Sequence, residues 1–453
     1  MHEIAHRSLR TEIDPDVLAW PGDDRYEAAR QPYNLSVDQR PNFVALPRNA
    51  DDVATVVRFA ADIGVRVAPQ RTGHAATAVG SLDGAMLLRT DRMRGIGLDA
   101  VRRRARVAAG IQWHDIVPAA SQVGLAALHG TASDVGVVGY TLGGGLSWYA
   151  RKHGLAVNRV TAIEVVTADG RLRWVDHNNE PDLFWALRGG GGNFGVVTAL
   201  DFDLVPAPEL YAGALLFPLE RSAEVLHAWR AWVAEVPDEM MSVGRILRIP
   251  PAPEVPEPLR GRAFALVEAV YLGAEAAGAE LLEPLRRLGP EIDTVGPAKP
   301  VDLAGLHMDP PDPLPYNGVH QLLEYLPGKA IDEIVRLAGP DSDSQLASFE
   351  LRHLGGALHR REPGQGALGV VPGSFATFAV GVTPDAASRG VVREHLDVLR
   401  AALQPYELGY EFPNFAMRPT EPSRLFDHTT ATRLRRLRAE LDPDRLFIAK
   451  HAI

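Results

Sequence analysis

The pattern of apolar and polar positions predicts alternating helices and strands in the first half of the chain. Apolar residues at helical spacing behind Asn49 or Asp51 predict a helix over residues 51–63, which Gly64 ends. Short apolar runs predict strands at 65–68, 86–88, 104–109, 160–168, 171–175 and 196–204, with further helices at 113–123 and 181–187. This mixture predicts an α+β fold in which helices cover sheets.

The pattern changes after Pro206, where prolines cluster in residues 250–258 and 297–315. Predicted strands at 348–354 and 374–382 follow, and predicted helices occupy 223–234, 386–403 and 430–441. We therefore expect a second domain to begin after Pro206.

Composition narrows the possible functions of this 453-residue chain. Its net charge is -10 and it has no dense basic stripe, so nucleic acid is not an expected partner. It contains no cysteine, which excludes disulfides, thiolate metal sites and a cysteine nucleophile. We expect no metal site. The chain has neither an apolar run long enough for a membrane span nor the apolar core of a signal peptide, so a soluble, cytoplasmic protein is expected.

Three segments rich in glycine and other small residues are the candidates for ligand binding. They are residues 71–77, which contain His74, residues 130–145, and residues 189–195, which hold five glycines. Backbone amides in such segments can converge on phosphate oxygens. The structural alternatives are tight or flexible turns, and an isolated histidine is usually an ordinary hydrogen-bonding residue.

Two formal motif matches have the wrong context. Residues 2–6 match HExxH of zinc peptidases, but they lie at the chain terminus, where no cleft or third ligand is expected. Residues 190–195 match GxGxxG, but a predicted helix precedes them and a strand follows, which reverses the order of a Rossmann unit. No Walker lysine follows the glycine-rich segments 130–145 and 189–195, so a bound dinucleotide is favoured over nucleotide hydrolysis.

Four segments together resemble the FAD-linked oxidases of the vanillyl-alcohol-oxidase superfamily, in a bacterial branch similar to the berberine-bridge enzymes. They are residues 67–74, 134–145, 183–198 and 442–447. The resemblance implies a two-domain, PCMH-type FAD-binding fold. It implies an N-terminal segment (1–36), an FAD domain (37–208), a substrate domain with an antiparallel sheet covered by helices (209–409), and a C-terminal segment that returns to the FAD domain (410–453).

The resemblance also implies how FAD is held. It places a covalent bond from the flavin 8α-methyl group on His74, and a single bond only, because Ala132 stands where many members have a second, cysteinyl link. Tyr140 would hydrogen-bond the N1–C2=O locus of the flavin. The expected FAD contacts are Arg71, Thr72, Gly73, His74, Ala75, Ala76, Thr131, Ala132, Val135, Gly136, Gly139, Tyr140, Gly143, Gly144, Gly145, Gly195, Val196, Val197 and Asn414.

The catalytic residues are predicted less directly. Phe412 stands where the family often has a tyrosine, so Tyr410 is the substitute candidate. Glu350 is a second candidate base, and Tyr140 completes the predicted catalytic set. Because side chains alternate along a strand, either Glu350 with Arg352, or His353, would face the flavin and the substrate.

The expected reaction is hydride transfer to flavin N5 from an alcohol, amine or related carbon of a small organic substrate, followed by reoxidation by O2. Two alternatives stay open. One is an FAD-dependent dehydrogenase that uses another electron acceptor, and the other is a flavin-binding protein that catalyses a non-redox rearrangement.

Overall fold

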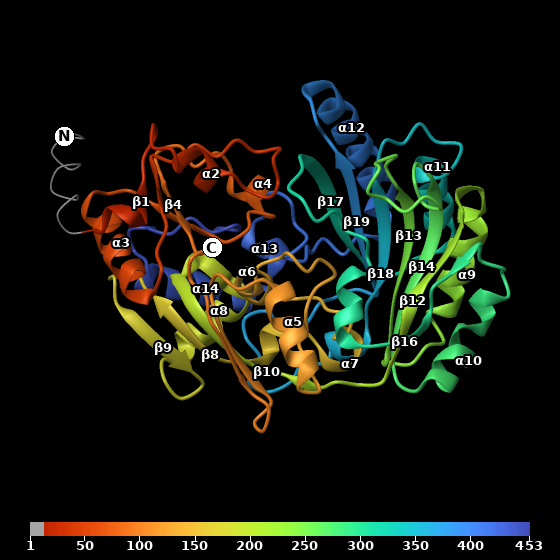
Figure 1. The fold of residues 1–453 in the computed structure, drawn as a ribbon, viewed down its shortest axis with the longest axis horizontal. Coiled ribbons are helices and arrows are strands. Elements are labelled where there is room, and N and C mark those ends of the chain that lie inside the picture. Colours follow the sequence, from red (N-terminus) through yellow and green to blue (C-terminus); the bar gives the residue numbers. More distant parts are fainter. Residues whose placement is uncertain (1–12) are drawn as a thin grey trace.

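A computed structural model describes residues 13–453, in which two groups of sheets lie side by side (Figure 1). The HExxH match at residues 2–6 lies outside this described part. Residues 18–206 contribute three small sheets, and residues 210–382 form a single large sheet. Within residues 13–453, no helix is long and apolar enough to cross a membrane.

The first group contains a four-stranded sheet in the order β1-β2-β4-β3 and a five-stranded antiparallel sheet in the order β5-β6-β10-β8-β9. A separate two-stranded sheet pairs β7 with β11. The strands are β1 Leu18–Ala19, β2 Phe43–Ala45, β3 Val67–Gln70, β4 Met86–Arg89, β5 Ile96–Asp99, β6 Arg104–Ala108, β7 Leu125–Ala126, β8 Val160–Val166, β9 Leu172–Asp176, β10 Val196–Asp203 and β11 Val205–Pro206. The helices are α2 Tyr26–Arg30, α3 Ala50–Asp62, α4 Ala76–Val79, α5 Trp113–Gln122, α6 Val137–Leu142, α7 Ala150–His153 and α8 Pro181–Gly190.

The large sheet is antiparallel, in the order β15-β12-β14-β13-β18-β19-β17, and β16 pairs with β12. Its strands are β12 Leu210–Pro218, β13 Met240–Arg248, β14 Ala263–Leu272, β15 Ile292–Asp293, β16 Gly296–Ala298, β17 Tyr316–Leu323, β18 Ser348–His353 and β19 Phe375–Val382. The later helices are α9 Ser222–Trp232, α10 Glu275–Arg286, α11 Gly328–Ala338, α12 Ala386–Leu403, α13 Pro422–Leu425 and α14 His428–Leu441.

Helices α9, α10, α11 and α12 cover one face of the large sheet (Figure 1). Trp229 of α9 is fully buried there, and it packs so closely over Gly244 of β13 that a Cβ on this glycine would lie 2.8 Å from the indole ring. Tight packing of this kind reserves the face for the core. The opposite face, which the helices leave uncovered, is therefore the one available to a ligand.

The predicted elements of the first half are present with small shifts at their ends. Asn49 rather than Asp51 caps α3, since its side chain accepts a hydrogen bond from the backbone N–H of Asp52. The strands β12, β13 and β14 were not located by pattern. Eight of the nine residues of both β12 and β13 are buried, so these strands lack the alternation of buried and exposed residues that marks a strand in sequence.

The C-terminal tail lies beside the first sheet. Val67 exchanges backbone hydrogen bonds with Leu446 and Ile448, both at 2.8 Å. Asp442 supports this turn by accepting hydrogen bonds from the backbone N–H groups of Leu446 and Phe447. The last residues of the chain are thereby brought next to the strand that leads to His74.

Candidate active site

A cavity of about 1300 Å³ is lined by both groups of sheets. One wall is made by residues 69–75, 130–143 and 189–197, and the opposite wall by the uncovered face of the large sheet. Residues 413–417 and 448–453 complete the lining. All three segments that the sequence singled out for ligand binding therefore meet at one cavity.

His74 is held in a fixed orientation at this cavity. Its Nε2 lies 2.9 Å from Asp134 Oδ2, and the Tyr33 ring stacks on the imidazole at a centroid distance of 3.8 Å. The hydroxyl of Tyr316 donates a hydrogen bond to the His74 carbonyl oxygen. Within residues 13–453, His74 Nδ1 has no hydrogen-bond partner. The imidazole is thus anchored through one nitrogen, and the other is left available.

Tyr140 presents an unpaired hydroxyl. Its ring is confined between Gly130 and Gly145, where a Cβ on either glycine would lie 2.8 Å from a ring carbon. The ring also meets Trp113 edge-on, with 5.3 Å between centroids. The hydroxyl oxygen is buried and has no hydrogen-bond partner in the described chain, and burial raises the pKa of Tyr140 well above its usual value. A buried unpaired hydroxyl at a cavity is a position where a ligand acceptor is missing.

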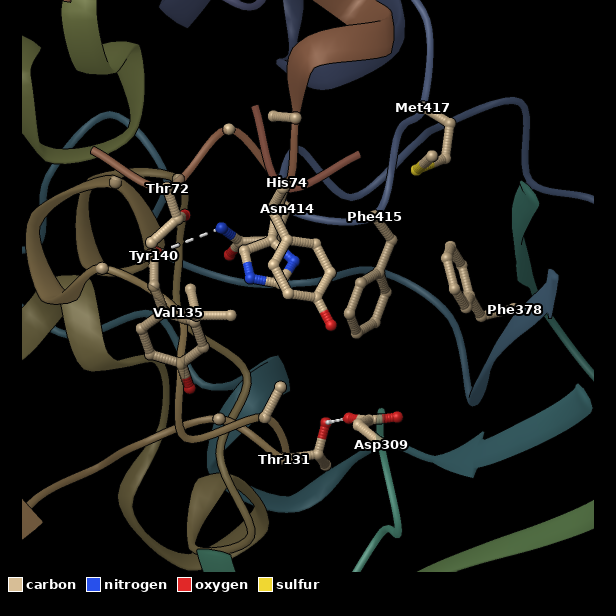
Figure 2. Close-up of a pocket in the computed structure, with 18 of the residues that line it drawn as sticks. Thr72, His74, Thr131, Val135, Tyr140, Asp309, Phe378, Asn414, Phe415 and Met417 are labelled. Carbon is tan, nitrogen blue, oxygen red and sulfur yellow. Dashed lines mark hydrogen bonds between the residues drawn. The ribbon is translucent and has the colours of Figure 1, made fainter. Parts of the chain in front are cut away.

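Asn414 connects the C-terminal segment to the second glycine-rich segment (Figure 2). Its Oδ1 accepts a hydrogen bond from the Gly145 backbone N–H at 2.8 Å, and its Nδ2 donates to the Tyr140 carbonyl at 3.1 Å. A Cβ on Gly143 would lie only 2.6 Å from Asn414 Nδ2. The glycine at 143 is therefore required for this close approach.

The third glycine-rich segment serves both packing and the cavity. Gly189 and Gly195 have positive φ, and a Cβ on either would lie within 2.6 Å of neighbouring protein atoms, so these two glycines are needed for packing. All five glycines of the segment line the cavity, but a Cβ on Gly191 would meet no atom within 4 Å. The expectation of close approach to a ligand therefore applies to the middle of the segment.

The large sheet brings a buried charged cluster to the cavity. Its five members, none more than 5% exposed, are Arg245, Glu268, His307, Glu350 and Arg352. His307 bridges the two carboxylates, with Nδ1 2.7 Å from Glu268 and Nε2 2.9 Å from Glu350. Arg352 lies 3.0 Å from Glu350, and Arg245 lies 3.2 Å from Glu268.

These contacts set the ionisation of the cluster. Burial alone would lower the pKa of His307, but the carboxylates of Glu268 and Glu350 raise it to about 9. Burial alone would raise the pKa of Glu350, but Arg352 and His307 hold that pKa well below its usual range. At neutral pH, His307 is therefore a cation and Glu350 a carboxylate.

The packing of the large sheet decides between the two predicted substrate-facing sets on β18. Glu350 and Arg352 line the cavity, whereas His353 does not. His353 lies 2.9 Å from Arg151 Nη1 and packs against Phe375, and burial lowers its pKa to about 3. Tyr410 does not line the cavity either; it is half-buried and packs against the core.

Most of the expected FAD contacts do line the cavity. They are Arg71, Thr72, Gly73, His74, Ala75, Thr131, Ala132, Val135, Gly136, Gly139, Tyr140, Gly143, Gly195, Val197 and Asn414. Four others, Ala76, Gly144, Gly145 and Val196, do not line it. Gly144 and Gly145 instead allow close packing, because a Cβ there would lie 2.8 Å from Phe412 and 2.6 Å from Ala156.

Sequence reasoning missed several residues of the site. Arg245, Glu268 and His307 come from β13, β14 and the loop before β17, and no local motif links them. Lys450 also lines the cavity, where its Nζ donates to the carbonyls of Pro413 and Asn414, and burial lowers its pKa to about 7. Asp134 lies within the glycine-rich segment 130–145, and this position was the one signal in the sequence that could have identified it as a site residue.

The residues present fit FAD. The unpaired hydroxyl of Tyr140 can donate to the pyrimidine edge of a flavin. A Cβ on Gly139 or Gly191 would meet no protein atom within 4 Å, so the backbone there is open to a ligand that approaches closely. His74 Nδ1 is available in the same cavity.

Comparison with known proteins identifies related sequences. Residues 41–176 match a family model described as an FAD binding domain. The xylooligosaccharide oxidase of Thermothelomyces thermophilus is 34% identical over 218 residues, which are 46% of this chain and 44% of that protein. The (R)-6-hydroxynicotine oxidase of Paenarthrobacter nicotinovorans is 35% identical over 191 residues, 42% of each protein. Each alignment thus spans less than half of the relative.

Solved structures show the same fold over nearly the whole chain. The 6-hydroxy-D-nicotine oxidase of Arthrobacter nicotinovorans matches with a TM-score of 0.83 at 23% identity, covering 95% of this chain and 96% of that one. Phl p 4, a grass pollen allergen with glucose dehydrogenase activity, matches with a TM-score of 0.85 at 17% identity and covers 99% of both chains. The predicted α+β fold is confirmed by these matches.

Proposed function

We propose that this chain is an FAD-dependent oxidase of a small organic substrate, and its match to an FAD binding domain over residues 41–176 and its fold support the proposal. The observation that carries the proposal is the cavity in which the candidate flavin loops face a buried charged cluster. FAD, when bound, supplies a two-electron acceptor for a hydride from an alcohol, amine or related carbon, and O2 is the final electron acceptor.

The chain's own residues have distinct tasks in this proposal. Tyr140 donates a hydrogen bond from its otherwise unpaired hydroxyl to the flavin. Glu350 is held as a carboxylate by Arg352 and His307, which suits it to accept a hydrogen bond from the substrate and makes it a weak proton acceptor. Tyr410 has no place in the proposed chemistry, because it does not line the cavity.

We infer that His74 forms the single covalent bond to FAD. The contact between its Nε2 and Asp134 supports this, because a carboxylate that accepts the Nε2 proton selects the tautomer with a free lone pair on Nδ1. Stacking by Tyr33 limits rotation of the ring. Asp134 is therefore a positioning residue for the linkage.

An absorbance spectrum before and after acid precipitation tests both inferences. Yellow colour should stay with the wild-type pellet, move to the supernatant in His74→Ala, and be divided between the two in Asp134→Asn. His177→Ala, at an exposed histidine, is the matched control and should behave as wild type. Purified protein without any flavin would refute the proposed function, and flavin released from the wild type would refute only the bond.

Turnover experiments separate the proposed oxidase from its alternatives. Oxygen consumption that accompanies substrate oxidation supports an oxidase, whereas anaerobic bleaching of the flavin without oxygen consumption in air indicates a dehydrogenase. A substrate that is converted without any bleaching indicates a non-redox rearrangement.

A further inference from the structure

The cavity face of the large sheet changes from charged to apolar along its strands. Paired residues on antiparallel strands share a face, and Arg245, Glu350 and Phe378 form one such row across β13, β18 and β19. Two residues further along each strand, the next row consists of Leu247, Ser348 and Val380. All six side chains line the cavity.

Further aliphatic residues extend the apolar end. Ile249, Val255 and Leu259 from the loop after β13 line the cavity, as do Leu346 and Val382. Two charged residues also lie in this region. Arg248 directs its guanidinium group to the carbonyl oxygen of Ala338, and Glu254 is exposed to solvent. The apolar end therefore offers a bound molecule mainly aliphatic surface.

At the charged end, the groups left without a hydrogen-bond partner are donors. Both carboxylate oxygens of Glu350 accept hydrogen bonds from Arg352, and one also contacts His307. Arg352 Nε is buried without a partner in the described chain. Among residues 13–453, no hydrogen bond engages Arg352 Nη1 or Arg245 Nη2. A ligand group that carries lone pairs or negative charge would complete these two guanidinium groups.

We propose that the substrate is an amphiphilic molecule, with an extended apolar body along the Leu247–Val380 row and one oxygen-acceptor group, such as a carboxylate, at Arg352 and Arg245. This proposal rests on the proposed oxidase function and adds the substrate class. A sugar carries a hydroxyl on nearly every carbon, and burying these hydroxyls unpaired against aliphatic side chains is unfavourable. The geometry therefore disfavours oligosaccharides.

Ligand binding to the yellow holoprotein tests the substrate class. The probes are 4-methyl-, 4-ethyl-, 4-propyl- and 4-butylbenzoate, with 4-butylbenzamidine and xylobiose for comparison, and binding is followed by the change in flavin absorbance and by thermal shift. We expect each added methylene to tighten benzoate binding by about fourfold. Butylbenzamidine, which is cationic, should bind at least about tenfold more weakly than butylbenzoate, and xylobiose should not bind. The proposal would be overturned if xylobiose bound more tightly than the alkylbenzoates, or if benzoate affinity did not depend on the length of the alkyl chain.

A pair of variants places the apolar body on the sheet. Val380→Thr puts a hydroxyl of similar size on the cavity face of β19 and should reduce the affinity gained per methylene. Val319→Thr is the matched control, because Val319 is also half-buried but packs on the helix-covered face. If the affinity gained per methylene were the same in both variants, the apolar row would not be part of the binding site. Flavin colour reports separately on the proposed function, so a yellow protein that fails these tests overturns only the substrate class.

Discussion

Replacement of Gly139 by alanine is expected to raise the stability of the flavin-free protein and to lower its flavin content. Gly139 lies inside α6 with a cavity in front of it, and an added Cβ would meet no protein atom within 4 Å. Alanine in a helix interior is favoured over glycine by about 0.8–1 kcal/mol, and this short helix should realise about 0.5–1 kcal/mol. The same methyl group would occupy space where the backbone is expected to approach FAD.

Gly136→Ala is the matched comparison from the same segment. Gly136 is the N-cap residue of α6, and a Cβ there would lie 2.9 Å from Arg71 Cγ. Arg71 is tied to the Gly110 carbonyl oxygen and to Asp91, so it can give way only by weakening these contacts. Overpacking of this kind costs about 1–3 kcal/mol. The two alanines should therefore change stability with opposite signs.

Urea unfolding of flavin-free protein from a riboflavin-limited host measures the stability of both variants, and absorbance measures flavin content after expression with riboflavin. We expect Gly139→Ala to be more stable than wild type without flavin but to carry less flavin. Full flavin content in this variant would refute close approach of the cofactor at Gly139. Lower stability without flavin would refute the structural reasoning about α6.

Three further predictions concern the connections within the site. Asn414→Ala should lower the free energy of unfolding by about 2–3 kcal/mol, because hydrogen bonds to Gly145 and Tyr140 are lost. Asn414→Asp keeps an acceptor for the Gly145 N–H but turns an oxygen toward the Tyr140 carbonyl oxygen, so it should also be destabilised, and wild-type stability of either variant in urea unfolding would contradict this. In the folded protein the pKa of His307 is raised to about 9, so the stabilisation that its charge provides is complete below about pH 6.5 and is lost as the pH rises through 9. The difference in unfolding free energy between wild type and His307→Gln should therefore shrink by about 3 kcal/mol over this range. A constant difference would argue against the buried cation. Tyr140→Phe should leave the stability of the flavin-free protein unchanged or higher, because the hydroxyl has no partner in the described chain. The same variant should slow reduction of the flavin by substrate, which stopped-flow absorbance would show. A less stable variant would mean that the hydroxyl has a protein partner.

Much of the cofactor side could be predicted from sequence because its residues are close together along the chain. Glycines at particular positions report local backbone requirements, and Gly73, with φ of +84° and Pro32 within 2.6 Å of its missing Cβ, is one such position. Helix α3 and its cap at Asn49 follow from local periodicity. The match of residues 41–176 to an FAD binding domain agrees with the cofactor that these segments indicated.

The substrate side was decided by tertiary structure. Glu350 and Arg352 were visible as candidates, but strand alternation alone could not say which face of β18 meets the cavity. Only the packing of α9 and α12 on the face that carries His353 assigns the other face to the cavity. His307 and Glu268 are brought to Glu350 by pairing of strands far apart in the chain. The local sequence cannot predict such contacts, because their energies depend on distances between side chains that are set only once the sheet has formed.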